Sequence, residues 1–205
     1  MLFRSSDGES LAAGPLTPKL NVASAANQSI NKKLSDANID PNSVFVFCPG
    51  AEYGPTKRWP AAHFAALAND LIQAHSNANI ILLGGKGDHQ LAEQILQQSQ
   101  NRKNIHNWCG ITSLDEAIAL IGIAKAVVSN DSGLMHIAAA LKTPQVAIFG
   151  SSDPAHTPPL SKNAKVIWLN LPCSPCHKKE CPLGHLKCLK DILPQQVFAT
   201  LNTLL

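Results

Sequence analysis

The sequence predicts an α/β fold, a Rossmann-like parallel sheet with helices on both faces. Short apolar runs alternate with amphipathic stretches of about 10 to 15 residues, which is typical of βαβ units. This alternation implies right-handed βαβ crossovers and a parallel sheet covered by helices on both faces. Hydrophobic residues make up 45% and charged residues 15% of the 205 positions, which fits a globular chain.

The individual elements follow from local periodicity and from the residues at their ends. Pro60 and Pro194 suit the first turn of a helix, and Ser113 with Glu116 has the spacing of a capping box. Strands are expected at residues 44–48, 79–83, 104–108, 126–129, 145–149 and 165–169. Helices are expected at residues 60–75, 89–98, 113–124, 133–141 and 191–204.

Residues 1–40 differ in composition from the rest of the chain. They are rich in Ser, Ala, Asn and Pro and show no sustained hydrophobic period, and Pro15, Pro18 and Pro41 interrupt any long element. We therefore expect residues 1–40 to be a linker or the remnant of a missing N-terminal domain. Residues 41–205 are expected to form the folded domain.

Charge and hydropathy exclude several classes of protein. The formal net charge of +3 is too small to indicate nucleic-acid binding by itself. No apolar run approaches the roughly 20 residues that span a bilayer, and the start of the chain lacks the apolar core of a secretory signal. A cytoplasmic location is therefore expected. Neither a GxGxxG dinucleotide fingerprint nor a Walker loop occurs.

Polar loops follow most of the expected strands, at residues 49–59, 84–88, 129–133 and 150–159. Ligands of open α/β sheets bind at the carboxyl ends of the strands, so these loops should meet at one rim. The loop at 129–133 leads into a helix, and a helix start favours anions. Asp131, Ser132, Gly133 and His136 there suit a phosphate joined to a polyhydroxyl group. Singly, these residues have ordinary alternatives, namely a helix cap, turn residues and an interior histidine.

Two further loops carry candidate ligand contacts. Lys57 and Arg58 can offset the charge of a diphosphate, and the alternative is a solvated basic turn. The loop at 150–159 holds hydroxyls, a carboxylate and His156, and the alternative is a proline-rich surface turn.

Three segments carry a resemblance to a known family: 57–60 (Lys-Arg-Trp-Pro), 130–136 (Asn-Asp-Ser-Gly-Leu-Met-His) and 156–159 (His-Thr-Pro-Pro). They resemble the donor domain of the ADP-heptose:lipopolysaccharide heptosyltransferases of glycosyltransferase family 9, and the similarity runs from about Pro18 to the C-terminus. The resemblance implies the C-terminal half of a GT-B glycosyltransferase, so that residues 41–205 would be a nucleotide-sugar-binding domain. It also implies a set of donor-binding residues: Lys57, Asp131, Ser132, Gly133 and His136, with Gly84, Gly85 and Asp88 on the nucleoside side.

The implied reaction is transfer of heptose, with inversion, from ADP-L-glycero-D-manno-heptose to the heptose of the lipopolysaccharide inner core at the inner membrane. Such transfer needs a base for the acceptor hydroxyl and positive groups for the departing ADP. Lys57 and the helix start supply the second requirement, whereas the base is expected in the missing N-terminal domain. We therefore expect the isolated chain to bind donor without transferring it. The alternative is a non-catalytic ADP- or nucleotide-sugar-binding module left by truncation.

Cys173, Cys176, Cys181 and Cys188 lie within one short segment. Their spacing is close to that of a small zinc knuckle, and thiolate-rich sites favour Zn²⁺, so a structural zinc ion is expected. Cys181 and His185 offer an alternative ligand set, which leaves the fourth ligand open. Reduced structural thiols or a local disulfide are the other interpretations. No cofactor is expected for the transfer, and the small charge argues against nucleic acid as a partner of this segment.

Overall fold

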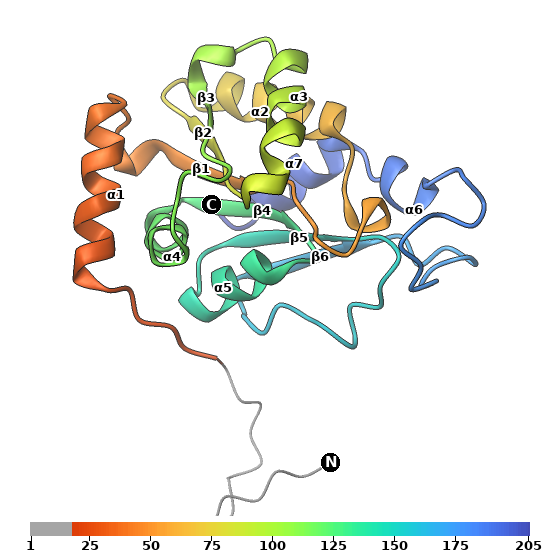
Figure 1. Ribbon diagram of the computed structural model, residues 1–205. Helices are drawn as coiled ribbons and strands as arrows, with labels where there is room; N and C mark the ends of the chain where they lie inside the picture. The colour runs from red at the N-terminus through yellow and green to blue at the C-terminus, as the bar shows by residue number, and fades with distance from the viewer. Residues whose placement is uncertain (1–17) are drawn as a thin grey trace, which may run out of the picture.

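The computed structural model describes residues 18–205 (Figure 1). Within these residues, six parallel strands form one sheet in the order β3-β2-β1-β4-β5-β6. The strands are β1 (Val44–Cys48), β2 (Asn79–Leu82), β3 (Ile105–Asn107), β4 (Ala126–Asn130), β5 (Gln145–Phe149) and β6 (Ala164–Trp168). The predicted parallel α/β sheet is confirmed, and every strand ends within one residue of its predicted limits.

The helices are α1 (Ser24–Asp36), α2 (Ala61–Ala74), α3 (His89–Gln98), α4 (Leu114–Ile123), α5 (Gly133–Leu141), α6 (Lys187–Lys190) and α7 (Pro194–Asn202). The predictions for α2 to α5 are confirmed. The helix predicted over 191–204 is confirmed as α7, but it begins only at Pro194, and the short helix α6 before it was not predicted. The capping box is confirmed, since Ser113 and Glu116 each accept a hydrogen bond from the backbone N–H of the other.

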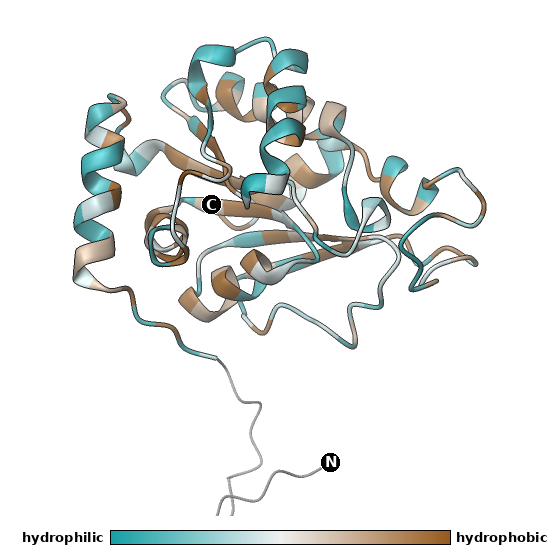
Figure 2. Ribbon diagram, viewed as in Figure 1, coloured by the Kyte–Doolittle hydropathy of each residue, from teal (hydrophilic) through white to brown (hydrophobic). Residues whose placement is uncertain are grey.

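Two apolar layers hold the sheet between its helices. Alternate residues of a strand point to opposite faces. In β1, Phe45 and Phe47 pack with side chains of α2, α3 and α7, whereas Val44 and Val46 pack with side chains of α1 and α4. Figure 2 shows the apolar colour concentrated on the strands and the teal, polar colour on outward-facing parts of the helices. Both faces of the sheet are thus covered, as the sequence predicts.

Helix α1 corrects the interpretation of the region before Pro41. The expectation that no long element forms in residues 1–40 is wrong from Ser24 to Asp36, and residues 1–17 lie outside the described part of the chain. The helix buries Ala26, Ile30 and Leu34 against the layer that contains α4. Only these three apolar side chains face the core, so the helix depends on tertiary packing more than on a strong local period.

Glu116 ties α1 to α4 and provides the first testable prediction. Its carboxylate accepts hydrogen bonds from Ser29 Oγ (2.6 Å), from the backbone N–H of Ser113 (2.8 Å) and from Lys33 Nζ (2.9 Å). These bonds, in that order of importance, lower the pKa of Glu116 to about 2. A lowered pKa in the folded chain means that this contribution to stability is complete above about pH 4.5 and is lost as the pH falls toward 2.

Glu116→Gln is therefore expected to lower the free energy of unfolding at pH 7 and to flatten its dependence on pH between about 4.5 and 2. Urea denaturation at a series of pH values measures both effects. Asp115→Asn, in the exposed part of the same helical turn, is the matched control and should leave that slope in place. An unchanged slope in Glu116→Gln would contradict the prediction.

Candidate functional site

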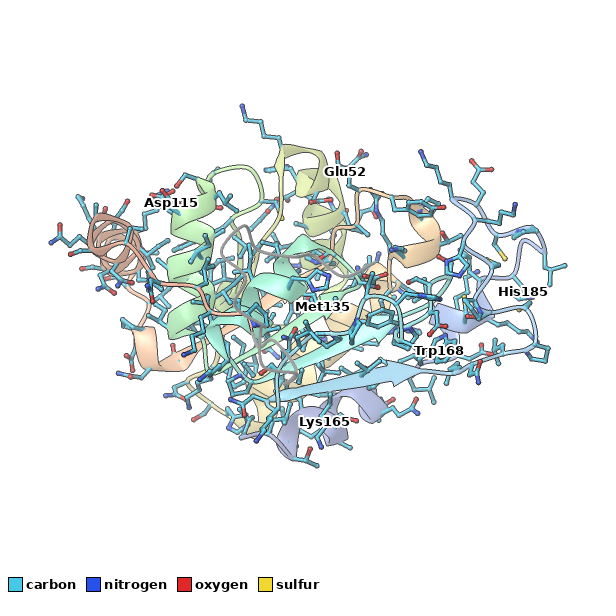
Figure 3. The ribbon with its side chains drawn as sticks, turned by 90° about the horizontal axis from the view of Figure 1, so that it is seen from below. Glu52, Asp115, Met135, Lys165, Trp168 and His185 are labelled. Carbon is cyan, nitrogen blue, oxygen red and sulfur yellow. The ribbon has the colours of Figure 1, made fainter. Side chains whose placement is uncertain are left out.

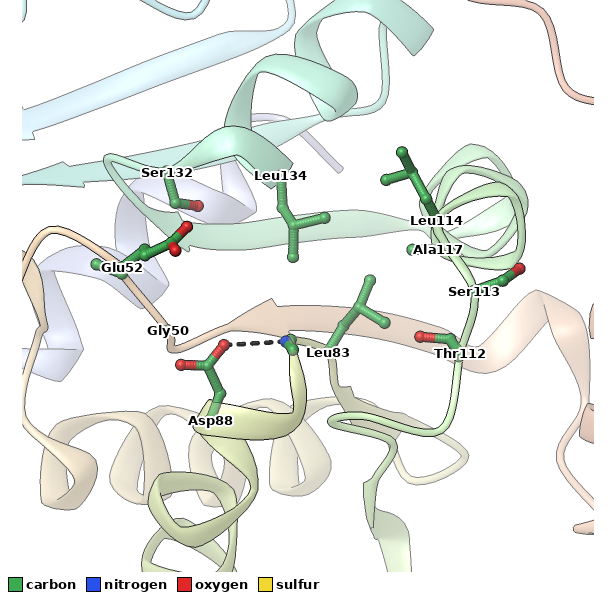
Figure 4. A pocket seen from close by; sticks show the side chains of 13 residues that line it. Gly50, Glu52, Leu83, Asp88, Thr112, Ser113, Leu114, Ala117, Ser132 and Leu134 are labelled. Carbon is green, nitrogen blue, oxygen red and sulfur yellow. Dashed lines mark hydrogen bonds between the residues drawn. The ribbon is translucent and has the colours of Figure 1, made fainter.

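The candidate site lies where the sheet changes its direction of winding. Strands β1 and β4 are neighbours, yet the chain leaves β1 toward β2 and leaves β4 toward β5 on the other side. Such a switch point opens a crevice at the carboxyl ends of the two strands. A cavity of about 250 Å³ lies there, between the loops that follow β1, β2, β3 and β4 (Figure 4).

The cavity combines apolar walls with polar groups at its edges. Leu83, Leu114 and Leu134 provide the apolar surface, and Leu114 is 65% exposed although it is large and apolar. Polar side chains come from the loops that follow β1, β2, β3 and β4. In Figure 4, Glu52 and Ser132 stand on one side of the cavity, Thr112 and Ser113 on the other and Asp88 at the base. This combination suits a flat, partly polar ring system with charged groups attached.

Asp88 is fixed by close contact with two backbone segments. The backbone N–H of Gly85 donates to its carboxylate (3.0 Å). A side chain at Gly50 or Gly84 would come within 2.3 Å or 2.7 Å of the same carboxylate, so glycine at both positions lets Asp88 lie where it does. The structure thus confirms that Gly84, Gly85 and Asp88 lie together at the rim, on one side of the cavity.

The thiols beneath this rim are not reactive groups. Burial, together with the charge of Asp88, raises the pKa of Cys109 to about 12 and raises that of Cys48 further. Both side chains therefore stay protonated at neutral pH and act as small apolar residues in the core, as their place beside strands predicts.

The start of α5 opens onto the cavity without a side-chain cap. Ser132 occupies the N-cap position, and no side chain accepts a hydrogen bond from the first turn. The alternative that Asp131 is merely the cap of this helix is therefore wrong. Ser132 Oγ is buried, has no hydrogen-bond partner and belongs to a residue that lines the cavity. Nothing lies within 4 Å of a side chain built at Gly133, so space for a ligand remains above this turn.

Asp131 and Lys57 form an ion pair beside the start of α5. Lys57 Nζ donates to Asp131 Oδ2 (2.6 Å), and Ser152 Oγ donates to the same oxygen (2.6 Å). Asp131 is only 6% exposed and Lys57 is 20% exposed, so the pair is largely shielded from water. The loops after β1, β4 and β5 thus meet, as predicted, and Asp131 holds the ammonium group of Lys57 next to the helix start.

Asn130 and Trp59 position the loop that carries Lys57, and we did not single out either as a site residue from the sequence. Asn130 Oδ1 accepts from the backbone N–H of Trp59 (3.0 Å), and Asn130 Nδ2 donates to the carbonyl of Pro49 (2.7 Å). Trp59 is fully buried, packs edge-on against Phe64 and donates from Nε1 to the carbonyl of Ile192 (2.9 Å). The signals for Asn130 were its place just after a strand and its membership of the 130–136 segment that carries the resemblance.

The two histidines of the candidate loops lie elsewhere. His136 is exposed on α5, so it is not an interior histidine. It is also absent from the residues that line the cavity, which include Asp88 and Ser132. His156 is also exposed, and its nearest carboxylate, Asp153, is 3.8 Å away. The 150–159 loop contributes Ser152 to the site instead, through its bond to Asp131.

The four clustered cysteines line a second, smaller cavity of about 130 Å³. All four are free thiols, so the alternative of a local disulfide is not seen. Burial and the neighbouring cysteines raise the pKa of Cys188 to about 11, whereas backbone N–H groups, first that of Leu186, lower the pKa of Cys181. As they are placed, no three His, Cys, Asp or Glu side chains of residues 18–205 are grouped so as to hold a metal ion.

Comparison with known proteins identifies the family. The sequence matches the family described as "Glycosyltransferase family 9 (heptosyltransferase)" over residues 1–187. The chain belongs to glycosyltransferase family 9. The match begins at residue 1, earlier than the expected start near Pro18, and stops before α7.

Among curated relatives, this family 9 chain is 41% identical over 194 residues to lipopolysaccharide heptosyltransferase 2 of Escherichia coli, covering 93% of the chain and 54% of that protein. It is 47% identical over 165 residues to lipooligosaccharide heptosyltransferase 2 of Haemophilus ducreyi, covering 78% of the chain and 47% of that protein. The chain therefore spans about half the length of the curated relatives that it matches.

Solved structures of heptosyltransferases share the fold. The structure of Escherichia coli ADP-heptose lipopolysaccharide heptosyltransferase II superposes with a TM-score of 0.80 at 39% identity, covering 95% of this chain and 55% of that one. A second Escherichia coli heptosyltransferase, solved with ADP, shares the fold alone, with a TM-score of 0.61 at 23% identity over 87% of this chain and 48% of that one. The predicted Rossmann-like fold is confirmed.

Within residues 18–205, no helix is long and apolar enough to cross a membrane.

Proposed function

We propose that this chain is the donor-binding half of an inverting heptosyltransferase that transfers heptose from ADP-L-glycero-D-manno-heptose to the heptose of the lipopolysaccharide inner core. One observation carries the proposal: an uncapped helix start lines a cavity at the switch point of the sheet, and a shielded lysine is paired with Asp131, the residue just before that helix start. Helix starts and lysines bind phosphate groups in proteins. The names of the 39–41% identical relatives supply the sugar and the acceptor.

The donor consists of a nucleoside, a diphosphate and a sugar, and we assign a place to each. We place the nucleoside between Leu83, Leu114 and Leu134, at the side where Gly84, Gly85 and Asp88 lie. The diphosphate would then lie at the start of α5, where Ser132 and Gly133 offer a free hydroxyl and open space.

Lys57 would neutralise the charge of that diphosphate. Asp131, fixed by Lys57 and Ser152, is the acceptor we assign to the sugar hydroxyls. His136 stays a prediction as a contact of the sugar or phosphate, since it is exposed on the same helix.

The chemistry divides between leaving group and acceptor. As the bond between heptose and ADP breaks, negative charge grows on the diphosphate, and Lys57 with the N–H groups of α5 stabilises that charge. The acceptor hydroxyl must lose its proton to a base, which we assign to the part of the relatives that this chain does not match. The acceptor would meet that base at the cytoplasmic face of the inner membrane, without nucleic acid or cofactor.

Calorimetric titration with ADP tests the proposal. We expect saturable binding of ADP and ADP-heptose, with a dissociation constant in the range of roughly 1 μM to 1 mM that donor sites commonly have, and weaker binding of UDP. A transfer assay with inner-core acceptor should give no product from the isolated chain. Measurable transfer by the isolated chain would contradict the assignment of the base to the part of the relatives that this chain does not match. Absence of ADP binding would overturn the donor site. Binding without transfer, even when the other half of a relative is supplied, would favour the non-catalytic module.

A further inference from the structure

The cavity between the cysteine-rich segment (residues 171–190) and the loop after β5 shares no lining residue with the larger cavity at the switch point. Cys173, Cys176, Cys181 and Cys188 all contribute to its wall. Figure 3 shows this segment, marked by His185, beyond the end of β6 at which Trp168 lies. Four thiols around a small cavity form a donor set that soft divalent metals prefer.

One polar feature of the wall points to a ligand inside. Ser151 is 1% exposed, lines the cavity, and its Oγ has no hydrogen-bond partner. A buried hydroxyl without a partner is costly, and a thiolate in the cavity would accept a hydrogen bond from it.

The orientation of His185 resolves the choice of the fourth ligand. His185 Nδ1 accepts a hydrogen bond from the backbone N–H of Lys187 (3.0 Å). In a neutral imidazole the proton then resides on Nε2, so neither ring nitrogen has a lone pair free for a metal. Cys188 is left as the fourth ligand.

We propose that Cys173, Cys176, Cys181 and Cys188 bind one zinc ion in this cavity. The thiols line the wall without meeting, so binding has to draw them inward while each gives up its proton to solvent. The resulting zinc–tetrathiolate group is negatively charged. Lys178, Lys179, Lys187 and Lys190 flank it in the sequence and offset that charge.

The zinc ion would fix the segment against the loop that carries Lys57. Thr56 Oγ1 donates to the carbonyl of Lys178 (2.5 Å), and Tyr53 Oη donates to the carbonyl of His177 (2.8 Å). On the other side, the backbone N–H groups of Cys176 and His177 donate to the carbonyl of Ser151 (3.0 and 2.8 Å). The cysteine segment therefore supports two of the three loops that meet at the ion pair of Lys57 and Asp131, those after β1 and β5.

Metal analysis of the full chain, purified without chelators or metal resins, tests the site directly. We expect roughly one equivalent of zinc per chain, and in the Co²⁺-substituted chain thiolate-to-cobalt charge-transfer bands. Cys181→Ser should lose the metal and the bands. Cys109→Ser, at a buried cysteine outside the cavity, is the matched control and should keep both. Thermal unfolding of the unmutated chain after chelation should show a Tm lower by roughly 5 °C or more.

Each outcome of these measurements either supports or overturns the zinc site. Zinc below about a third of an equivalent with no cobalt bands, a disulfide among the four cysteines, or equal zinc in Cys181→Ser and the unmutated chain would each overturn the site. None of these readouts depends on donor binding, so a failure here leaves the proposed function standing. Only the inference that the zinc ion supports the Lys57 loop rests on the proposed function. Weaker ADP binding after chelation would measure that support.

Discussion

Replacing Lys57 with methionine is expected to weaken ADP binding by roughly 10- to 100-fold, which corresponds to the loss of about 1.5–3 kcal/mol for a hydrogen bond to a charged group. Methionine keeps the length and much of the apolar stem of lysine but removes the ammonium group that would face the diphosphate. The same change leaves Asp131, which is 6% exposed, without its cation. Because breaking a buried pair costs about 3–5 kcal/mol, some loss of stability should accompany the loss of binding.

A double variant separates these two effects. Lys57→Met with Asp131→Asn removes the unpaired charge, so it should recover stability without recovering ADP affinity. Lys103→Met, in the 3-10 turn η4 (Arg102–Asn104) that precedes β3, makes the same charge change at the opposite end of the sheet and should leave binding unaltered. Calorimetry and urea denaturation of the three variants provide the comparison. A folded Lys57→Met chain that binds ADP as tightly as the unmutated chain would refute the role of this lysine.

Trp59→Ala should have the largest effect on stability, a loss of about 3–5 kcal/mol. The indole is fully buried, contacts Phe64 and anchors the loop after β1 to the segment before α7 through the carbonyl of Ile192. Alanine leaves a cavity at this junction and also leaves that carbonyl without its donor. The free energy of unfolding from urea titration measures the loss.

Two further tryptophan variants identify the source of that loss. Trp59→Phe removes the Nε1 donor and one of the two fused rings but keeps an aromatic ring in the core, so its cost should be smaller than that of alanine and at least the roughly 1–2 kcal/mol of one buried hydrogen bond. Trp168→Ala lies on the edge strand β6 and is only partly buried, so it should cost less than Trp59→Ala. Equal losses of unfolding free energy in Trp59→Ala and Trp168→Ala would show that the buried Trp59 contributes no more to stability than the partly buried Trp168.

The sheet could be predicted because its information is local. Each strand is a short run of apolar residues between polar loops, and parallel strands that are covered on both faces need no alternation. Helix α1 was missed because its three core-facing residues stand among polar ones, and its stability comes from α4, far away in the sequence. The short helix α6 lies in the cysteine-rich segment, where no apolar period marks a helix.

The candidate site could be predicted as a set of residues but not as a network. The rule for parallel sheets brings the loops of Lys57 and Asp131 to one rim, yet nothing in the sequence shows that these two side chains pair or that Ser152 joins them. His136 follows Gly133 by about one helical turn, but its side chain emerges on the exposed side of α5. The direction of a side chain on a helix depends on how the helix packs, which the order of residues does not reveal.

The side chain of Asn130 has a kinetic consequence. One amide group holds the two ends of the loop from Pro49 to Trp59, and it does so from the buried end of β4. Closing this loop is therefore part of folding and does not have to accompany ligand capture. Association of a nucleotide with such a prearranged rim should be limited by diffusion and orientation rather than by the ordering of a loop, so affinity differences among ligands should reside mainly in their rates of release.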